Sequence, residues 1–209
     1  MKIIRGFSVR LAQISWSVGG GMMKVTHRAL GILILAGALL GPGVAGSESG
    51  HGEQDVKVAF VYNFAALTTW PDASFSSPTA PLTLALLGPA DFAAGTEKFF
   101  EGRRVGQRPV EVSRISDPSE VGRYHLIFVG ADEQNRTESI LRHARGARVL
   151  TIGETEGFAN RGGIINFYPD GRRIRFEINL EAAHSSGLKI SSRLLRLARL
   201  VESSETRGD

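Results

Sequence analysis

The amino-acid sequence predicts a mixed α/β fold, with a mainly parallel sheet, helices on both faces, and a C-terminal β-hairpin followed by further helices. Short apolar runs at residues 82–88, 124–130 and 148–153 are typical of buried strands, and helical patterns lie between them. Apolar strands that are separated by helices favour a parallel sheet covered on both faces. Near the end of the chain, residues 162–179 alternate apolar and polar positions around a Pro-Asp-Gly sequence, which indicates a hairpin.

The first predicted helix covers residues 55–69. Four apolar residues recur along it at helical spacing and form one face: Val56, Phe60, Phe64 and Leu67. The sequence Trp70-Pro71 should end this helix, because the residue before a proline avoids the helical region.

Strands and helices follow in order along the middle of the chain. After a loop at 72–81, the predicted elements are strand 82–88, helix 91–102 with Asp91 as its cap, strand 108–115, strand 124–130, helix 131–146 and strand 148–153. The alternation at 108–115 is imperfect. Helix 131–146 begins with acidic and ends with basic residues, which agrees with the helix dipole.

The C-terminal part changes character. Two alternating strands within 162–179 should pair around the turn, and Asn179 should cap a short helix that Gly187 ends. A final helix at about residues 189–202 is then expected from helical spacing. Its predicted buried face consists of Ile190, Leu194, Leu197 and Val201.

The N-terminal region has the pattern of a secretory signal. Residues 1–46 contain five basic and no acidic residues, and an apolar run at 29–40 precedes small residues around Ala45 and Gly46, where cleavage is expected. Met22 and Met23 stand directly before the basic start of this signal, so we expect translation to begin at one of them rather than at Met1. An uncleaved N-terminal anchor is the alternative, although the run is short for a membrane span.

The domain organisation follows from these patterns. We expect a flexible leader at 47–54, a single α/β domain at 55–202 and a disordered tail at 203–209. The chain has no cysteine, which excludes disulfides and a lipid anchor on a cysteine after the signal. Beyond residue 46, the chain has 20 basic and 21 acidic residues, so its formal charge of +4 belongs to the N-terminal region. That balance excludes a basic nucleic-acid-binding domain.

Sequence motifs for catalysis or metal binding are missing. There is no nucleophile elbow, phosphate-binding loop, dinucleotide fingerprint or helical zinc pair. The histidines beyond the N-terminal region are interpreted as surface or edge residues rather than ligands: His51, His125, His143 and His184. The sequence therefore predicts no catalytic residue, no metal and no cofactor.

Polar residues on the last predicted strand leave two interpretations open. Arg173, Arg175, Glu177 and Asn179 fall on the face opposite Ile174, Phe176 and Ile178. This face is either the solvated side of an antiparallel strand or a recognition patch in which Arg175 and Glu177 are anchors.

Two further polar groups are also ambiguous. Lys189, Arg193, Arg196 and Arg199 follow one side of the final predicted helix, which is either a solvated face or a surface for an acidic partner. Tyr62 and Asn63 interrupt an apolar helix, so a buried hydrogen bond to the sheet or the wall of a pocket is expected there.

Three segments together resemble the YfiR family. They are VKVAFVYNFAALTTWP, LLGPADF and GFANRGGIINFYPDGRRIRFEINLEAAHSSGLKISSRLLRLA, and the resemblance covers roughly residues 55–201. It implies a small, non-catalytic α/β protein of the periplasm that binds and represses the sensor domain of an inner-membrane diguanylate cyclase. Such a protein lowers cyclic di-GMP and biofilm formation. Some relatives carry cysteine pairs linked to redox control, and this chain has none.

The resemblance also implies partners and site residues. Homodimers are expected, and so is a second partner, an outer-membrane peptidoglycan-associated protein. Ten residues stand on signature positions: Tyr62, Asn63, Trp70, Gly162, Gly163, Arg175, Glu177, Asn179, Lys189 and Ser192. The eight residues that are not glycine are the predicted partner- or ligand-binding residues. The alternative function is a periplasmic small-ligand sensor without a cyclase partner, with a crevice near Gly88–Phe92 and Gly130–Asp132.

Overall fold

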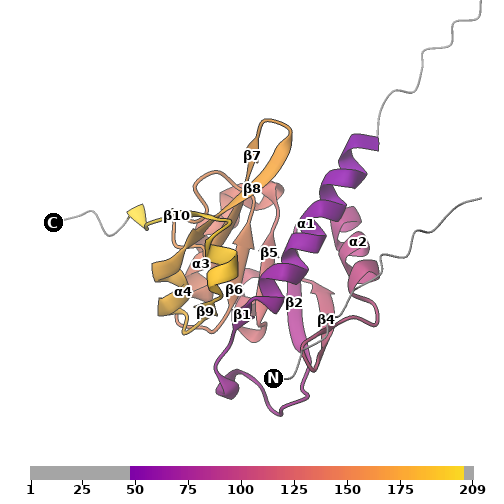
Figure 1. Ribbon diagram of the computed structural model, residues 1–209, viewed down its shortest axis with the longest axis vertical. Coiled ribbons are helices and arrows are strands. Elements are labelled where there is room, and N and C mark those ends of the chain that lie inside the picture. The colour runs from indigo at the N-terminus through magenta and orange to yellow at the C-terminus, as the bar shows by residue number, and fades with distance from the viewer. Residues whose placement is uncertain (1–47, 205–209) are drawn as a thin grey trace, which may run out of the picture. The chain divides into compact units, whose positions relative to one another are not determined.

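The computed structural model of the protein describes residues 48–204 (Figure 1). The predicted signal segment, both candidate start sites and residues 205–209 of the predicted tail lie outside these residues. The prediction of a disordered tail from residue 203 is wrong for its first two residues, because Ser203 and Ser204 form hydrogen bonds with Asn179 and Asn160. The helices are α1 (Glu48–Ala66), α2 (Ala90–Phe100), α3 (Thr137–Ala144), α4 (Leu180–Ser185) and α5 (Ser192–Leu195), with 3-10 helices η1 (Asp72–Ser74), η2 (Pro118–Arg123) and η3 (Ala131–Arg136).

An eight-stranded sheet forms the centre of the domain. Its strands are β2 (Leu82–Leu87), β3 (Arg104–Val105), β4 (Arg108–Arg114), β5 (Leu126–Val129), β6 (Leu150–Gly153), β7 (Ile165–Asp170), β8 (Arg173–Asn179) and β10 (Arg199–Val201). The order across the sheet is β10-β8-β7-β6-β5-β2-β4-β3, and five of its seven pairings are parallel. The strands β1 (Thr68–Thr69) and β9 (Lys189–Ile190) form a separate antiparallel pair. The predicted α/β class is confirmed.

Helices cover both faces of the sheet because the central strands are apolar on both sides. On one face, α1 and α2 pack over Leu84, Leu86 and Phe128. On the other face, α3 and η2 pack over residues such as Ile127 and Val129. Burial of both faces explains why β2, β5 and β6 were recognisable as continuous apolar runs.

An aromatic cluster fixes α1 on the strands β7 and β8. Phe64 lies 4.9 Å from Phe176 and 5.5 Å from Phe167, measured between ring centroids. Phe60 lies 5.6 Å from Phe176 and 5.9 Å from Phe167. Figure 1 shows the consequence: α1 lies across the sheet next to the β7–β8 hairpin, whose end extends beyond the neighbouring strands.

Three helix predictions need correction at their starts. Helix α1 begins at Glu48, so residues 48–54, which were expected as a leader, are helical. Pro89, not Asp91, is the N-cap residue of α2, and Asp91 lies inside the first turn. The predicted helix 131–146 is a 3-10 helix up to Arg136 and becomes α-helical from Thr137.

The prediction of a final helix at 189–202 is wrong. Helix α5 is a single turn, capped by the Ser191 side chain, and the chain then forms β10 parallel to β8. Pairing with β8 satisfies backbone groups that an open sheet edge would leave unpaired. Leu197, which was expected to be buried, is 68% exposed.

Candidate functional site

The β7–β8 hairpin is confirmed, and its turn differs from the expected one. Asp170 pairs with Arg173, so the loop consists of Gly171 and Arg172, with Gly171 at φ +61°. Such a positive φ favours glycine. Pro169 pairs with Ile174 inside the strands and does not form part of the turn. The hairpin therefore carries basic residues at its very end.

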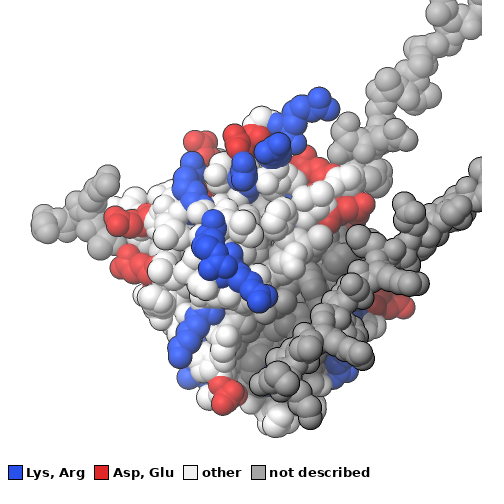
Figure 2. All heavy atoms as spheres, in the orientation of Figure 1, with Lys and Arg blue, Asp and Glu red and all other residues white. Residues whose placement is uncertain are grey.

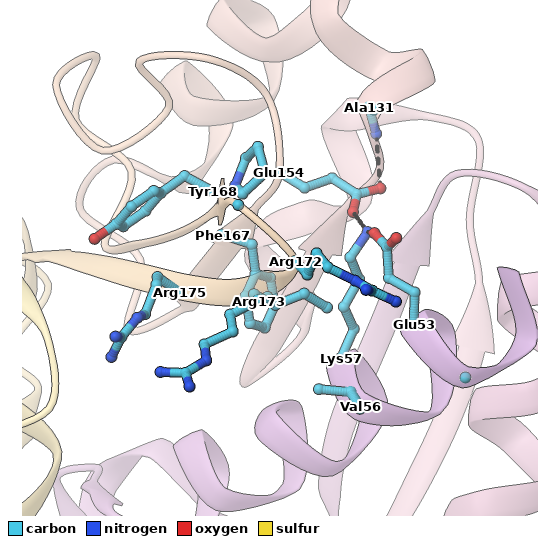
Figure 3. Close-up of a pocket in the computed structure, with 14 residues that line it drawn as sticks. Glu53, Val56, Lys57, Ala131, Glu154, Phe167, Tyr168, Arg172, Arg173 and Arg175 are labelled. Carbon is cyan, nitrogen blue, oxygen red and sulfur yellow. Dashed lines mark hydrogen bonds and ion pairs between the residues drawn. The ribbon is translucent and has the colours of Figure 1, made fainter. Parts of the chain in front are cut away.

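A groove of about 970 Å³ separates this hairpin from the N-terminal half of α1 (Figure 3). Val56 from α1 and Phe167, Tyr168, Pro169 and Ile174 from the hairpin give it apolar walls. The other lining residues are two glycines, Ala131 and six charged residues: Gly52, Gly171, Ala131, Glu53, Lys57, Glu154, Arg172, Arg173 and Arg175. The groove thus combines an apolar surface with charged side chains.

An ion-pair cluster holds α1 against the carboxyl edge of the parallel strands. The Lys57 Nζ atom lies 2.6 Å from a Glu154 carboxylate oxygen and 2.8 Å from one of Glu53. The other Glu154 oxygen accepts a hydrogen bond of 3.0 Å from the Ala131 backbone N–H, and Figure 3 shows these contacts. Burial by itself lowers the pKa of Lys57, but hydrogen bonds and charge interactions with Glu154 and Glu53 outweigh it and raise the pKa above its ordinary value.

Three arginines of the hairpin line the groove. Arg175 forms a 3.2 Å ion pair with Asp170, and both side chains are exposed. Within the described part of the chain, Arg172 and Arg173 have no ion-pair partner, and both are exposed. Figure 3 shows Arg172 extending toward Glu53 and Lys57, whereas Arg173 and Arg175 extend together in another direction. The hairpin therefore presents unneutralised positive charge beside the apolar walls.

Glu177 does not belong to a solvated face, as one interpretation expected, because it is buried within the sheet. One of its carboxylate oxygens accepts a 3.1 Å hydrogen bond from the Asn166 amide, and the other accepts two from the Arg199 guanidinium. Arg199 also lies over the Tyr168 ring, 4.2 Å from its centroid. Its hydrogen bond to Glu177 raises the pKa of Arg199. The network links β7, β8 and β10, and it leaves Glu177 a structural residue.

The chain's family is decided by its match along almost the whole described domain. A family model described as YfiR/HmsC-like matches residues 54–199. The chain belongs to the YfiR/HmsC-like family. This membership points to a periplasmic regulator of cyclic di-GMP signalling, from a regulatory rather than a catalytic family.

Two solved structures align with parts of this YfiR/HmsC-like chain. One is a conserved domain protein from Vibrio cholerae O1 biovar eltor str. N16961, with 11% identity, a TM-score of 0.48 and coverage of 70% of this chain and 59% of that chain. The other is the ABC domain in complex with L-Trp from Streptococcus pneumonia, with 13% identity, a TM-score of 0.42 and coverage of 59% and 55%. The chain spans less than two thirds of either structure.

Asn179, a signature position of the YfiR resemblance, has a local structural role. Its side chain accepts a hydrogen bond from the Ala182 N–H, which confirms the predicted cap of α4. Its amide group donates to the Ala159 carbonyl at 2.9 Å and to the Ser203 hydroxyl at 2.8 Å. Asn179 is fully buried and ties the C-terminal segment to the 154–163 loop.

Tyr62 and Asn63 make different contacts from those expected. Asn63 is exposed, and its amide bonds the carbonyl of Ala59 one turn earlier in α1. Asn63 therefore forms neither the expected buried hydrogen bond to the sheet nor the wall of a pocket. Tyr62 packs between α1 and α2 against Phe99 and Phe100, and its hydroxyl donates to the Arg104 carbonyl.

Trp70 bonds to the backbone of His125, a half-buried histidine of this YfiR/HmsC-like domain. Its indole N–H donates to the His125 carbonyl at 3.1 Å. The His125 ring stacks on Phe75, accepts a 3.1 Å bond from the Thr83 N–H at Nδ1, and lies 2.9 Å from the Ser74 carbonyl at Nε2. His125 is therefore half-buried and hydrogen-bonded as a neutral ring with its proton on Nε2.

Acidification should destabilise the fold through His125. Burial lowers its pKa, the Ser74 carbonyl opposes this, and the positive charge of Arg108 lowers it further, so the net pKa is lowered. The unfolded chain takes up this proton below about pH 6.5, while the folded ring stays neutral. We therefore expect the free energy of unfolding in urea to decrease as the pH falls below that value.

Replacement of His125 by asparagine should remove much of this pH dependence. The matched variant His184→Asn, at an exposed residue of α4, should keep it. If the free energy of unfolding depended on pH equally in the wild type and in His125→Asn, His125 would not be the source of the acid sensitivity.

The remaining predicted residues, Lys189 and Ser192, lie away from the groove-lining set. Lys189 is exposed on β9, where it pairs with Thr69, and Ser192 is exposed at the start of α5. Figure 2 shows basic side chains both at the hairpin end and lower, over the C-terminal segment. The structure therefore separates the predicted site residues, and Arg175 is the member that lines the groove.

The crevice predicted for a small ligand is not at the groove. Gly88 and Gly130 lie against each other: a Cβ on Gly130 would be 3.2 Å from the Gly88 Cα and 2.7 Å from an Asp132 oxygen. Ala131 is the one residue of the predicted ranges that lines the groove.

Neither metal ligands nor a membrane span occur among the residues described. From 48 to 204, no three His, Asp or Glu side chains are gathered as a metal site. No helix in the same range has the length and apolar character needed to cross a bilayer.

Four groove residues, Glu53, Lys57, Glu154 and Arg172, were not selected from the sequence, and Arg173 was placed only on the polar face of its strand. The spacing of Glu53 and Lys57 is that of a helical ion pair, and Arg172 and Arg173 are the second loop residue and the first residue after the loop of the predicted hairpin. The sequence gives no direct sign that the hairpin and α1 meet.

Proposed function

We propose that this protein binds the periplasmic sensor domain of an inner-membrane diguanylate cyclase and holds it inactive. The observation that carries the proposal is the YfiR/HmsC-like match over residues 54–199. By holding the cyclase inactive, the protein lowers cyclic di-GMP and biofilm formation. Arg175 stands in this proposal as a partner-binding residue, while Lys189 and Ser192 belong to a second exposed surface.

Repression by contact requires a difference in affinity. A regulator can shift its partner toward an inactive state only if it binds that state more tightly than the active one. Moving an equilibrium from 1:99 to 99:1 takes a difference of about 10⁴-fold. The groove beside the hairpin supports this proposal, since it offers both apolar area and directional charge to a partner.

Deletion of the gene should raise cellular cyclic di-GMP and biofilm formation. The expected reason is release of the cyclase from its inactive state. Cyclic di-GMP would be measured by mass spectrometry in the wild type, the deletion strain and a complemented strain. Unchanged levels in the deletion strain, in cells where the cyclase is expressed, would contradict the proposal.

We further propose export to the periplasm, a homodimer, and sequestration by an outer-membrane peptidoglycan-associated protein. Fractionation of cells and light scattering of the purified protein test the first two. The alternative function, a small-ligand sensor, is supported by the volume of the groove, which is in the range of ligand sites. A melting temperature that rises with one compound of a metabolite screen would favour this alternative.

A further inference from the structure

The end of the β7–β8 hairpin carries two arginines, Arg172 and Arg173, that have no ion-pair partner among the described residues. Arg175 forms an ion pair with Asp170. All three arginines line the groove. Arginine prefers carboxylates, which its planar donors bind in a bidentate manner. An occupant of this groove therefore gains most if it carries carboxylates.

The walls of the groove require a second property of the occupant. Val56 on α1 is 45% exposed although it is a large apolar residue, and Ile174 on the hairpin, which also lines the groove, is half-buried. Phe167 and Pro169 extend the apolar wall. A partner side chain that covers Val56 and Ile174 would remove apolar surface from water, which is favourable.

Unlike Arg172 and Arg173, Lys57 is not available to bind an acidic group of a partner. It already contacts Glu53 and Glu154, and its exposed fraction is 16%. These three side chains carry two negative charges and one positive charge. With Arg172, Arg173 and Arg175, the charged side chains that line the groove carry a net charge of +2, which favours an acidic over a basic partner segment.

We infer that the groove between α1 and the β7–β8 hairpin docks an acidic amphipathic segment of a partner protein. Carboxylates of the segment bind Arg172 and Arg173, and its apolar side chains cover Val56 and Ile174. This inference deepens the proposed function, on which it rests for the identity of the partner, by naming the surface and the chemistry that it recognises.

A defined peptide tests the surface directly. The probe is a fluorescein-labelled peptide of about eight residues with alternating glutamate and leucine, and binding to the purified protein is followed by fluorescence anisotropy. We expect saturable binding that weakens as the salt concentration rises from about 0.05 to 0.5 M. A peptide of alternating lysine and leucine should not bind.

Charge reversal locates the binding site. The variant Arg172→Glu/Arg173→Glu should weaken binding of the acidic peptide by about tenfold or more. The matched variant Arg193→Glu/Arg196→Glu changes the net charge equally, at exposed residues of α5 and the position after it, and should bind like wild type. A third variant, Arg172→Gln/Arg173→Gln, removes the charges without reversal and should give an intermediate loss. Circular dichroism melts confirm that each variant is folded.

Three outcomes would overturn the inference: no loss in the 172/173 variants, an equal loss in the 193/196 variant, or equal binding of the lysine peptide. The proposed function is tested separately with the periplasmic domain of the cyclase. If that domain binds wild type and the 172/173 reversal equally, the inference fails and the proposed function stands. If the peptide behaves as expected and the domain does not bind, the proposed function fails.

Discussion

Replacing Gly163 by alanine should lower the free energy of unfolding by about 3 kcal/mol. A Cβ at this position would lie 2.2 Å from two carbon atoms of the Phe158 ring and 2.8 Å from the Phe158 carbonyl oxygen. The ring cannot move aside, because Phe158 is completely buried and Gly153, at the end of β6, also lies against it: a Cβ on Gly153 would be 2.4 Å from the ring. The clash must therefore displace backbone. Urea unfolding of the purified variant measures the loss.

Gly95 provides the matched control. It lies inside α2, is exposed, and has no atom within 4 Å of the position where its Cβ would be. Gly95→Ala should stabilise the protein by about 0.5–1 kcal/mol, because glycine is unfavourable in a helix. In addition, Phe158→Leu should reduce the cost of Gly163→Ala, since the two residues are in contact. Equal small effects of Gly163→Ala and Gly95→Ala would contradict the steric explanation.

Replacing Arg199 by alanine should lower the free energy of unfolding by about 2–3 kcal/mol. Arg199 itself is largely exposed, with 57% of its side chain accessible, but the side chain of its partner Glu177 is 4% accessible. The variant leaves that carboxylate buried with Asn166 as its one hydrogen-bond donor among the described residues. The loss of the Arg199 contact with Tyr168 adds to the effect. Urea unfolding again provides the measurement.

Arg175 is the natural comparison, since it is also an ion-paired arginine on the same sheet. Its partner Asp170 is exposed, so Arg175→Ala should change stability by less than about 1 kcal/mol. The double variant Glu177→Gln/Arg199→Ala should recover part of the lost stability, because it leaves no buried charge. If Arg199→Ala and Arg175→Ala had the same small effect, burial of Glu177 would not matter as we describe.

The central part of the fold was predictable because its signals are local. Strands β2, β5 and β6 are buried on both faces, so each is a continuous apolar run. The hairpin was recognisable from Gly171, which takes the positive φ that the turn requires. The capping role of Asn179 was equally visible, since asparagine at the start of a helix has a specific hydrogen-bonding function.

The C-terminal strand could not be predicted because its stability is not local. The spacing of Leu194 and Leu197 fits a helix, but β8 offers an unpaired edge and Glu177 requires a cation. Tertiary pairing therefore overrides local propensity in this segment. The same reasoning explains Glu177. Strand alternation correctly predicted that it lies on the opposite face of β8 from Phe176, but the sequence did not reveal β10, the neighbouring strand whose Arg199 covers it.

The candidate site was predictable only in part. Arg175 was selected from strand alternation and lines the groove, but Glu177 and Asn179 on the same strand are structural. Lys57 and Glu154 are far apart in the sequence and meet because α1 lies across the sheet. Such contacts depend on tertiary packing, which the periodicity of either segment does not contain.

The position of α1 has a consequence for how the chain acquires its structure. This helix is synthesised before any strand of the sheet, yet Phe64 packs on Phe167 and Phe176, which come late in the chain. Contacts between segments so distant in sequence give a high contact order, and folding is correspondingly slow. Until the last quarter of the polypeptide is available, the aromatic side of α1 remains exposed and open to aggregation, so a holding chaperone should improve the yield of refolded protein.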